Sequence, residues 1–191
     1  MKNRAIFFDK DGVLNIDKGI QGNKEQAELY AGVGDLIAYF KNKKFKIFVV
    51  TNQPVVARGM LTEAELNKLF DEFQKIILAQ NKKAIIDKIY YCPHHPNANV
   101  EKYRKNCECR KPKAGMLNQA AREFDIDLKN SYMVGDRISD IIAGYLAGCK
   151  TVHVMSGKHE EKMIETDLVL NKEVKPDFVI SDILRLEDIV L

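Results

Sequence analysis

The 191-residue sequence predicts an α/β fold built on a doubly wound parallel sheet in a single domain. Short apolar segments alternate along the chain with segments whose apolar residues recur at helical spacing, which is typical of parallel strands joined by crossover helices. Several apolar segments also end abruptly in polar residues, as expected where the carboxyl ends of parallel strands face a ligand. We see no internal repeat or low-complexity segment that would argue for another architecture.

In the first half of the chain, strands are expected at residues 4–8, 46–50 and 88–91. A helix is expected at 33–41, where Leu36, Ile37 and Phe40 lie at helical spacing, and another from Thr62 to about residue 80. Thr62 followed by Glu65 matches a capping box at the start of that second helix. The polar residues 15–31 and the cysteine- and histidine-rich segment 92–109 are expected to be irregular.

In the second half, the pattern predicts helices at residues 115–124 and 141–147, strands at 132–134 and 151–154, a sixth strand at 177–180 and a closing helix at 183–191. Residues 157–171 are polar, and we expect a short helix followed by a loop there. No insertion is long enough for a separate cap domain. We therefore expect loops at 15–31, 53–60 and 92–110 to cover the site.

The composition is ordinary for a soluble globular protein, with 46% hydrophobic and 30% charged residues. A net charge of +3 gives no case for a nucleic-acid surface and mildly favours an anionic substrate. No apolar run approaches membrane-spanning length, and Asp9 interrupts the N-terminal apolar run, so neither a membrane segment nor a signal peptide is expected. We expect a cytoplasmic monomer that binds a small molecule, with no nucleic-acid or membrane partner.

The strongest local signal is the segment Ile6-Phe7-Phe8-Asp9-Lys10-Asp11-Gly12, where a buried strand ends in two carboxylates. Two carboxylates this close repel each other unless a cation lies between them, and magnesium prefers such hard oxygen ligands. Taken alone, the segment could equally be a solvated turn at the end of a strand.

Three further segments follow in the chain: a strand that ends in Thr51, the cations Arg110 and Lys111 before a helix, and a strand followed by Asp136 and Asp140. Together with the first segment, and in this order, they resemble the four motifs of the haloacid dehalogenase superfamily of phosphotransferases. The resemblance covers nearly the whole chain. It implies the strand order 5-4-1-2-3, which would bring Asp9 and Asp136 to face each other at the point where the strand order reverses.

The resemblance also implies a role for each residue of the motifs. Asp9 would attack phosphorus and Asp11 would act as general acid and base, while Thr51 and Lys111 would stabilise the phosphoryl oxygens. Magnesium would be held by Asp9, the backbone carbonyl of Asp11 and Asp136, with Asp140 orienting that group. Structural alternatives exist for three of these residues: Thr51 as a β-branched strand residue, Lys111 as a solvated cation, and Asp140 as an acid that favours a helix N-terminus.

The irregular segment carries a second candidate metal site, made of a Cys-x-His and a Cys-x-Cys pair. Cys92, His94, Cys107 and Cys109 are the expected ligands of a structural zinc ion, although His95 could replace His94. The alternative, buried thiols beside a surface histidine, is poor because the segment lacks the periodicity of a core element. Cys149 follows a helix end and is expected to be a small core residue.

These cysteines and histidines narrow the resemblance to the D-glycero-D-manno-heptose 1,7-bisphosphate phosphatases and the related histidinol-phosphatase domains. Further residues that match the heptose enzymes include the segment Ala57-Arg58-Gly59. The resemblance implies magnesium-dependent hydrolysis of a heptose bisphosphate to the 1-phosphate, in lipopolysaccharide precursor synthesis. Asn52, Arg58, Arg110 and Lys111 would contact the sugar phosphate. A histidinol-phosphatase and an inactive, zinc-stapled binding module are the alternatives.

The segment after Thr51 departs from the family, because Asn-Gln-Pro-Val-Val stands where Asn-Gln-Ser-Gly-Ile is usual. Pro54 lacks a backbone donor, and Val55 cannot adopt a glycine conformation without strain. A second departure is Ala31-Gly32, where Pro-Gly is usual. We expect these changes to alter the loops near the substrate rather than the catalytic residues.

Overall fold

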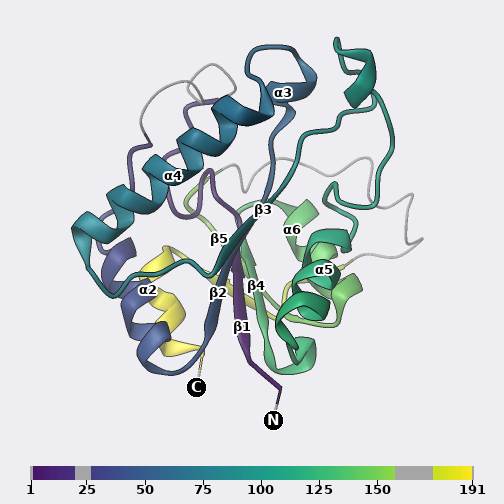
Figure 1. Cartoon of the computed structure of the whole chain (residues 1–191). Coiled ribbons are helices and arrows are strands. Elements are labelled where there is room, and N and C mark those ends of the chain that lie inside the picture. Colours follow the sequence, from purple (N-terminus) through teal and green to yellow (C-terminus); the bar gives the residue numbers. More distant parts are fainter. Residues whose placement is uncertain (1, 20–26, 158–173, 191) are drawn as a thin grey trace.

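The computed structural model describes residues 2–19, 27–157 and 174–190 and is built on a six-stranded parallel sheet (Figure 1). The strands are β1 (Ala5–Phe8), β2 (Lys46–Asn52), β3 (Lys88–Cys92), β4 (Tyr132–Gly135), β5 (Lys150–Val154) and β6 (Phe178–Ile180). Their order is β3-β2-β1-β4-β5-β6. The expected order of the first five strands is confirmed, and the sixth strand pairs with β5 at one edge.

Two helices cover each face of this sheet. Helices α2 (Val33–Asn42) and α4 (Glu63–Gln80) lie on one face, and α5 (Gly115–Phe124) and α6 (Ile138–Ala147) lie on the other (Figure 1). Parallel strands joined by right-handed crossovers place their helices in this way when the chain winds outward in both directions from a central strand. The central strand is β1, which pairs with both β2 and β4.

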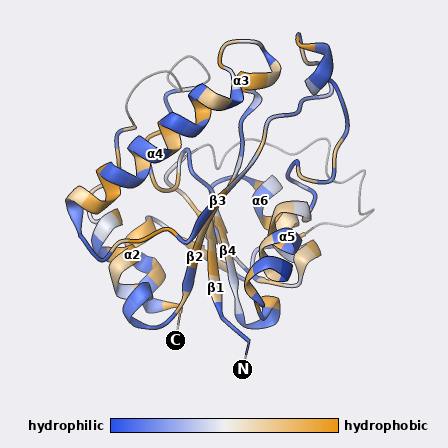
Figure 2. Ribbon diagram, viewed as in Figure 1, coloured by the Kyte–Doolittle hydropathy of each residue, from blue (hydrophilic) through white to orange (hydrophobic). Residues whose placement is uncertain are grey.

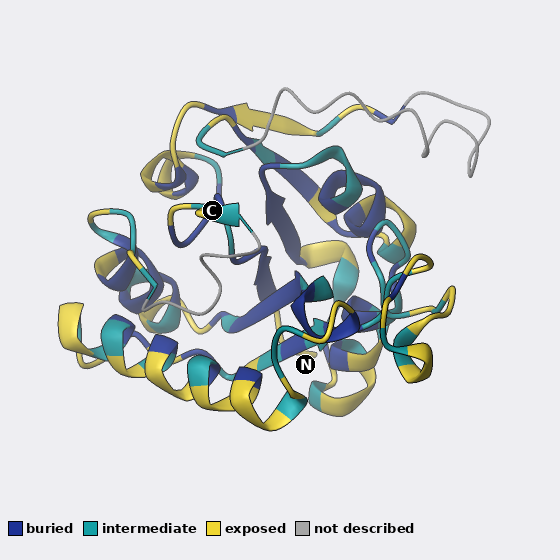
Figure 3. Cartoon of the chain, turned by 90° about the horizontal axis from the view of Figure 1, so that it is seen from above, coloured by how far each residue is buried: buried dark blue, intermediate teal, exposed yellow. Residues whose placement is uncertain are grey.

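The alternation of side chains along β1 divides the hydrophobic core into two parts. Ile6 and Phe8 pack with Leu36 of α2 and Phe73 of α4, whereas Phe7 packs with residues of the α5 and α6 face. All four residues of β1 are fully buried, because helices cover both faces of the sheet. In Figure 3 the buried positions follow the strands and the inward sides of the helices.

Helix α4 begins as its sequence predicts. Thr62 accepts a hydrogen bond from the Glu65 N–H, and the Glu65 carboxylate accepts one from the Thr62 N–H, so the expected capping box is present. Figure 2 shows hydrophobic and hydrophilic residues alternating along the helix. Its buried residues are Leu66, Phe70, Phe73 and Ile77. No helix among the described residues is long and apolar enough to span a membrane.

Several elements differ from the sequence expectations by more than a residue or two at their ends. The expected closing helix is a 3₁₀ helix, η3 (Ile183–Asp188), and α6 begins three residues early at Ile138, because Asp140 accepts a hydrogen bond from the Arg137 N–H. The expected loop at 53–60 contains a short helix, α3 (Pro54–Ala57). Short 3₁₀ turns η1 (Glu101–Tyr103) and η2 (Leu128–Asn130) occur within connections. Most of the polar segment 157–171 lies outside the described residues.

Helix α3 explains how Pro54 and Val55 fit after β2. Pro54 occupies the first turn of the helix, where its missing N–H is not needed. Val55 and Val56 are helical and buried against Leu66 and Phe70 of α4, so no glycine conformation is required. The segment that departs from the usual family sequence is therefore a packed helical turn in this chain.

Asp87 joins α2, β2 and the start of β3. Its carboxylate accepts a hydrogen bond from the Ile47 N–H at 2.8 Å and forms ion pairs with Lys41 and Lys46. Burial alone would raise the pKa of Asp87, but the Ile47 N–H and Lys41 more than offset this and lower it. The carboxylate therefore stabilises the fold above its ordinary pKa, and this contribution is lost as the pH falls through the lowered value.

We predict that Asp87→Ala lowers the free energy of unfolding by about 1–3 kcal/mol near neutral pH, because it leaves a partly buried N–H and two lysines without their acceptor. Urea denaturation measures the change. Asp188→Ala is the matched control, since Asp188 pairs with Arg185 on an exposed 3₁₀ turn and should change stability by less than about 0.5 kcal/mol. Equal effects of the two substitutions would show that Asp87 does not join these elements.

Candidate active site

The polar residues at the strand ends gather at the carboxyl edge of the sheet, where Asp9 and Thr51 line a cleft. Asp9 follows β1, Thr51 lies near the end of β2, and Asp136 follows β4. The cleft has a volume of about 240 Å³. Its lining includes four carboxylates and four permanent cations: Asp9, Asp11, Asp17, Asp140, Arg58, Arg110, Lys111 and Arg137.

Lys111 lies at the centre of this edge, with only 4% of its surface exposed. Its Nζ lies 2.8 Å from Asp9 Oδ1 and 2.6 Å from Asp140 Oδ1, and it donates a hydrogen bond to the Val50 carbonyl at 2.7 Å. Burial alone would lower the pKa of Lys111, but Asp140 and Asp9 more than offset this and raise it. The side chain is therefore a buried ammonium group, which excludes the alternative of a solvated cation.

Asn52 holds the backbone of Lys111 in place. Its side-chain amide donates to the Lys111 carbonyl at 3.0 Å and accepts from the Lys111 N–H at 3.1 Å. Asn52 was expected to contact substrate. It lines the cleft, but both of these hydrogen bonds of its side-chain amide go to the backbone of Lys111. This reciprocal pair fixes the buried lysine relative to β2.

Three carboxylates beside Lys111 have the donor set of a magnesium site. One oxygen each of Asp9, Asp136 and Asp140 lies within 4.8 Å of the others, and all three residues are buried. Gly12, with φ of 88°, and Gly157 border the Asp136 carboxylate so closely that a Cβ at either position would clash with it. Three buried carboxylates against one ammonium leave an excess of negative charge, which a hard divalent cation would neutralise.

The pKa of Asp9 reflects this excess. Burial raises it to about 7, helped by Asp140 and Asp136 and opposed by Lys111. Asp140 has the predicted position beside the group, and it also accepts the Arg137 N–H at the start of α6. Asp140 therefore lies both beside the buried carboxylates and at the start of α6.

The Asp11 side chain bonds a different set of partners. Its carboxylate accepts hydrogen bonds from Lys10 at 2.6 Å, Asn15 at 2.9 Å and Gln53 at 3.1 Å. Burial alone would raise the pKa of Asp11, but Lys10 and the other donors more than offset this and lower it. In this state Asp11 is a carboxylate, the form that accepts a proton.

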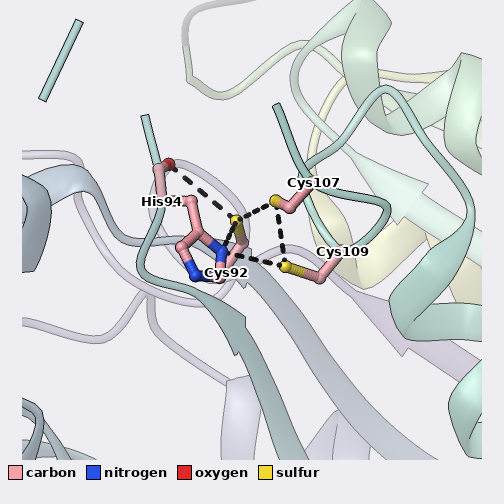
Figure 4. A group of neighbouring side chains, drawn as sticks. All are labelled: Cys92, His94, Cys107 and Cys109. Atoms are coloured by element: carbon pink, nitrogen blue, oxygen red, sulfur yellow. Dashed lines mark hydrogen bonds between the residues drawn. The ribbon is translucent and has the colours of Figure 1, made fainter. Parts of the chain in front are cut away.

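The expected zinc ligands converge in the loop after β3 (Figure 4). Cys107 Sγ lies 3.4 Å from Cys92 Sγ and 3.1 Å from Cys109 Sγ, and His94 Nδ1 lies 3.7 Å from Cys92 Sγ and 3.4 Å from Cys109 Sγ. All three thiols are free. Ligands at zinc–sulfur distances of about 2.3 Å in a tetrahedron lie about 3.8 Å apart, so this cluster needs little change to enclose the ion.

The structure also separates the two adjacent histidines. His94 faces the thiols, whereas His95 Nδ1 accepts a hydrogen bond from the Asn97 N–H and His95 lines the cleft. The pKa of Cys109 falls to about 5, chiefly because Cys92 donates a hydrogen bond to its thiolate. A thiolate is the form of cysteine that binds metal.

The loop that contains this cluster is tied to its surroundings at several points. Tyr91 and Tyr103 both donate hydrogen bonds to the Glu63 carboxylate at the start of α4, at 2.9 and 2.7 Å. Arg110 Nη1 donates to the His94 carbonyl at 3.0 Å. The direction of the Arg110 side chain thus depends on the conformation of the Cys/His cluster.

Both arginines expected to contact substrate, Arg58 and Arg110, line the cleft. Three further residues line the cleft that the sequence had not indicated there: His95, Arg137 and Asp17. Arg137 pairs with Asp17 at 3.3 Å across the mouth of the site. The position of Arg137 directly after Asp136 at a strand end was a usable signal, whereas Asp17 lies in an irregular segment that gave none.

Curated proteins of known activity match most of this chain. A protein of Haemophilus ducreyi is 41% identical over 177 residues, which cover 91% of this chain and 96% of that protein, and it is named D-glycero-beta-D-manno-heptose-1,7-bisphosphate 7-phosphatase. A protein of Campylobacter jejuni is 42% identical over 161 residues, covering 84% of this chain and 87% of its own, and is named the corresponding alpha-heptose 7-phosphatase.

Solved structures and a family model agree with these matches. The crystal structure of the D,D-heptose 1,7-bisphosphate phosphatase of B. bronchiseptica, complexed with magnesium and phosphate, has a TM-score of 0.79 and 28% identity and covers 97% of this chain and 96% of its own. A HAD-like phosphatase structure from Mesorhizobium loti has the same TM-score at 24% identity, over 99% of this chain and 85% of its own, and so supports the fold. Residues 108–186 match a family model described as HAD-hydrolase-like.

We predict that the Asp9 carboxyl group of metal-free protein titrates at about pH 7, because of its burial beside Asp140 and Asp136. A raised pKa means that this group stabilises the fold fully below its unfolded pKa and that the contribution is lost as the pH rises to about 7. Carbonyl ¹³C NMR measures the titration, with Asp9→Asn to assign the signal. Added Mg²⁺ should move the titration to lower pH, and a metal-free midpoint near 4 would contradict the prediction.

Proposed function

This chain belongs to the haloacid dehalogenase-like phosphatases, and we propose that it removes the C7 phosphate of a D-glycero-D-manno-heptose 1,7-bisphosphate. The observation that carries the proposal is the distribution of cations in the cleft. Lys111 contacts Asp9, where one phosphate would react, and three arginines that line the same cleft would contact a second phosphate: Arg58, Arg110 and Arg137. The names of the two relatives that match most of the chain support this choice.

In the proposed reaction, Asp9 attacks phosphorus in line with the leaving oxygen and forms an aspartyl-phosphate. Lys111 and Thr51 donate hydrogen bonds to the phosphoryl oxygens. When bound at Asp9, Asp136 and the Asp11 carbonyl, with Asp140 beside them, a magnesium ion supplies positive charge to the same oxygens. The magnesium in the related B. bronchiseptica structure supports this assignment.

Asp11 acts as the general acid and then as the general base. The negative charge of an incoming phosphate favours protonation of Asp11, which then gives this proton to the departing alkoxide. In the second step the Asp11 carboxylate takes a proton from the water that hydrolyses the aspartyl-phosphate, and phosphate leaves. Its position beside Asp9 at the end of β1, on the lining of the cleft, supports both roles.

The proposed zinc ion at Cys92, His94, Cys107 and Cys109 is structural, since four protein ligands close its coordination sphere. It acts on the reaction through the loop, because Arg110 bonds the carbonyl of His94 and Lys111 follows Arg110 in the chain. The substrate-facing cations are thereby fixed by a metal that does not touch the substrate.

The arginines in the cleft also separate the two candidate substrates. Histidinol phosphate carries an amine and an imidazole, which the three arginines would repel, whereas a second phosphate would pair with them. An inactive binding module would have no need of a buried lysine between two carboxylates. We further propose that the protein acts as a single-domain monomer in the cytoplasm, in the synthesis of heptose precursors of lipopolysaccharide.

We predict that Arg110→Ala lowers kcat/KM for the heptose bisphosphate by about ten- to a hundredfold, since a hydrogen bond to a charged group contributes about 1.5–3 kcal/mol. The same substitution should change hydrolysis of p-nitrophenyl phosphate by less than about threefold, because that ester has no second phosphate. Phosphate release measures both activities.

Two controls accompany this measurement. Arg185→Ala, at an exposed arginine away from the cleft, should leave both activities unchanged, and Asp9→Asn should abolish both. Equal losses on the two esters would remove Arg110 from substrate recognition. Faster cleavage of histidinol phosphate than of the bisphosphate at limiting concentration would overturn the proposed substrate.

We predict that the purified protein contains about one zinc ion per chain and that Cys107→Ser and His94→Ala both lower this content. His95→Ala and Cys149→Ser are the matched controls and should retain zinc, because these side chains lie outside the cluster. Elemental analysis measures the metal content. Freshly purified protein without zinc would refute the structural site, and zinc loss in His95→Ala but not in His94→Ala would exchange the two histidines.

A further inference from the structure

The side chain of Gln53 connects two residues of the proposed reaction without lining the cleft. It follows β2 and is only 1% exposed. Its Nε2 lies 3.1 Å from Asp11 Oδ2 and 3.1 Å from Thr51 Oγ1. Gln53 lines a separate cavity of about 40 Å³ behind Asp11, between the loop after β1 and α4.

The chemistry of the amide group fixes the direction of both hydrogen bonds. The Asp11 carboxylate can only accept, so the amide nitrogen of Gln53 and not its oxygen must face it. The same nitrogen carries a second hydrogen and no acceptor, so Thr51 Oγ1 must accept it. The hydroxyl hydrogen of Thr51 is therefore directed away from Gln53, and Thr51 lines the cleft in which the phosphoryl group would lie.

The backbone around Gln53 is held firmly enough to transmit this orientation. The Gln53 N–H donates to the Cys92 carbonyl at 2.8 Å, which ties it to the end of β3. Gln53 is also the residue before α3, whose Val55 and Val56 are buried against Leu66 and Phe70. Because the backbone is held on both sides, the side chain of Gln53 is restricted to one rotamer.

We infer that Gln53 is a positioning residue that orients the Thr51 hydroxyl as a donor to the transferred phosphoryl group, with the Asp11 carboxylate as the anchor of its amide. The inference rests on the proposed phosphatase function. Without the amide hydrogen, the Thr51 hydroxyl could donate to another acceptor in the ground state. That hydrogen bond would have to break before the hydroxyl could donate to the phosphoryl group, which raises the activation free energy. The effect should therefore fall on kcat more than on KM.

The test uses Gln53→Met, which keeps the length of the side chain but has no amide hydrogen. With p-nitrophenyl phosphate as substrate, we expect kcat to fall about ten- to a hundredfold and KM to change less than about threefold. Gln74→Met is the matched control, because Gln74 also makes two hydrogen bonds but joins α4 to the loop before β3, and its kcat should equal that of the wild type. A kcat of Gln53→Met within about twofold of the control would overturn the inference.

A double substitution distinguishes positioning from a general loss of structure. If Gln53 acts through Thr51, adding Gln53→Met to Thr51→Val should lower kcat by less than about threefold beyond Thr51→Val alone, whereas fully multiplicative losses would contradict the proposed route. If Gln53→Met does not fold, as judged by its melting temperature and zinc content, Gln53→Leu serves instead. It also lacks the amide hydrogen and adds no charge beside Asp11, so the same loss and the same non-additivity are expected. If the wild-type protein hydrolyses no phosphate ester, the proposed function itself is wrong. If the wild type is active and Gln53→Met is equally active, only the inference about Gln53 is wrong.

Discussion

The buried ammonium group of Lys111 joins parts of the chain that are far apart in sequence. It contacts Asp9 after β1, the Val50 carbonyl in β2 and Asp140 in α6, all away from solvent. An isolated charge in this position would be very unfavourable, and so would the carboxylates without it. Each group is tolerated only because the others are present, which makes this edge of the sheet an electrostatic unit rather than a set of separate side chains.

That unit depends in turn on a loop with little hydrophobic core of its own. The chain between β3 and Lys111 contains one 3₁₀ turn and is held by the four-residue Cys/His cluster and by the hydrogen bond of Tyr103 to Glu63, which Tyr91 of β3 also contacts. Polar contacts and the Cys/His cluster hold this loop, whereas apolar packing holds the helices. The loop can therefore remain at the surface, where it borders the cleft, and still present Lys111 at a defined depth.

The sequence predicted the elements whose signal is repeated along the chain. The capping box of α4 depends on two residues that agree with each other, and the sheet order followed from the resemblance of four motifs to one family; both are present. Spacing could not choose between His94 and His95, because neighbouring residues differ only in the direction that the backbone gives them. The segment that contains Pro54 was expected to be a loop. Its helical turn depends on the packing of Val55 and Val56 against α4, which lies outside the local sequence. The ion pair of Asp17 with Arg137 joins segments 120 residues apart, and no local pattern could predict it.

The register between β2 and β3 places Asn52 opposite Cys92, so the first cysteine of the cluster is aligned by the sheet with the residue that grips Lys111. At its other end the loop returns through Cys107 and Cys109 to the residues just before Lys111. Both ends of the excursion are thus fixed independently of what lies between them. The residues from 96 to 106 lie between these two ends and outside the lining of the cleft, so a substitution there acts on the cleft only through the ends that the sheet and the cysteines hold.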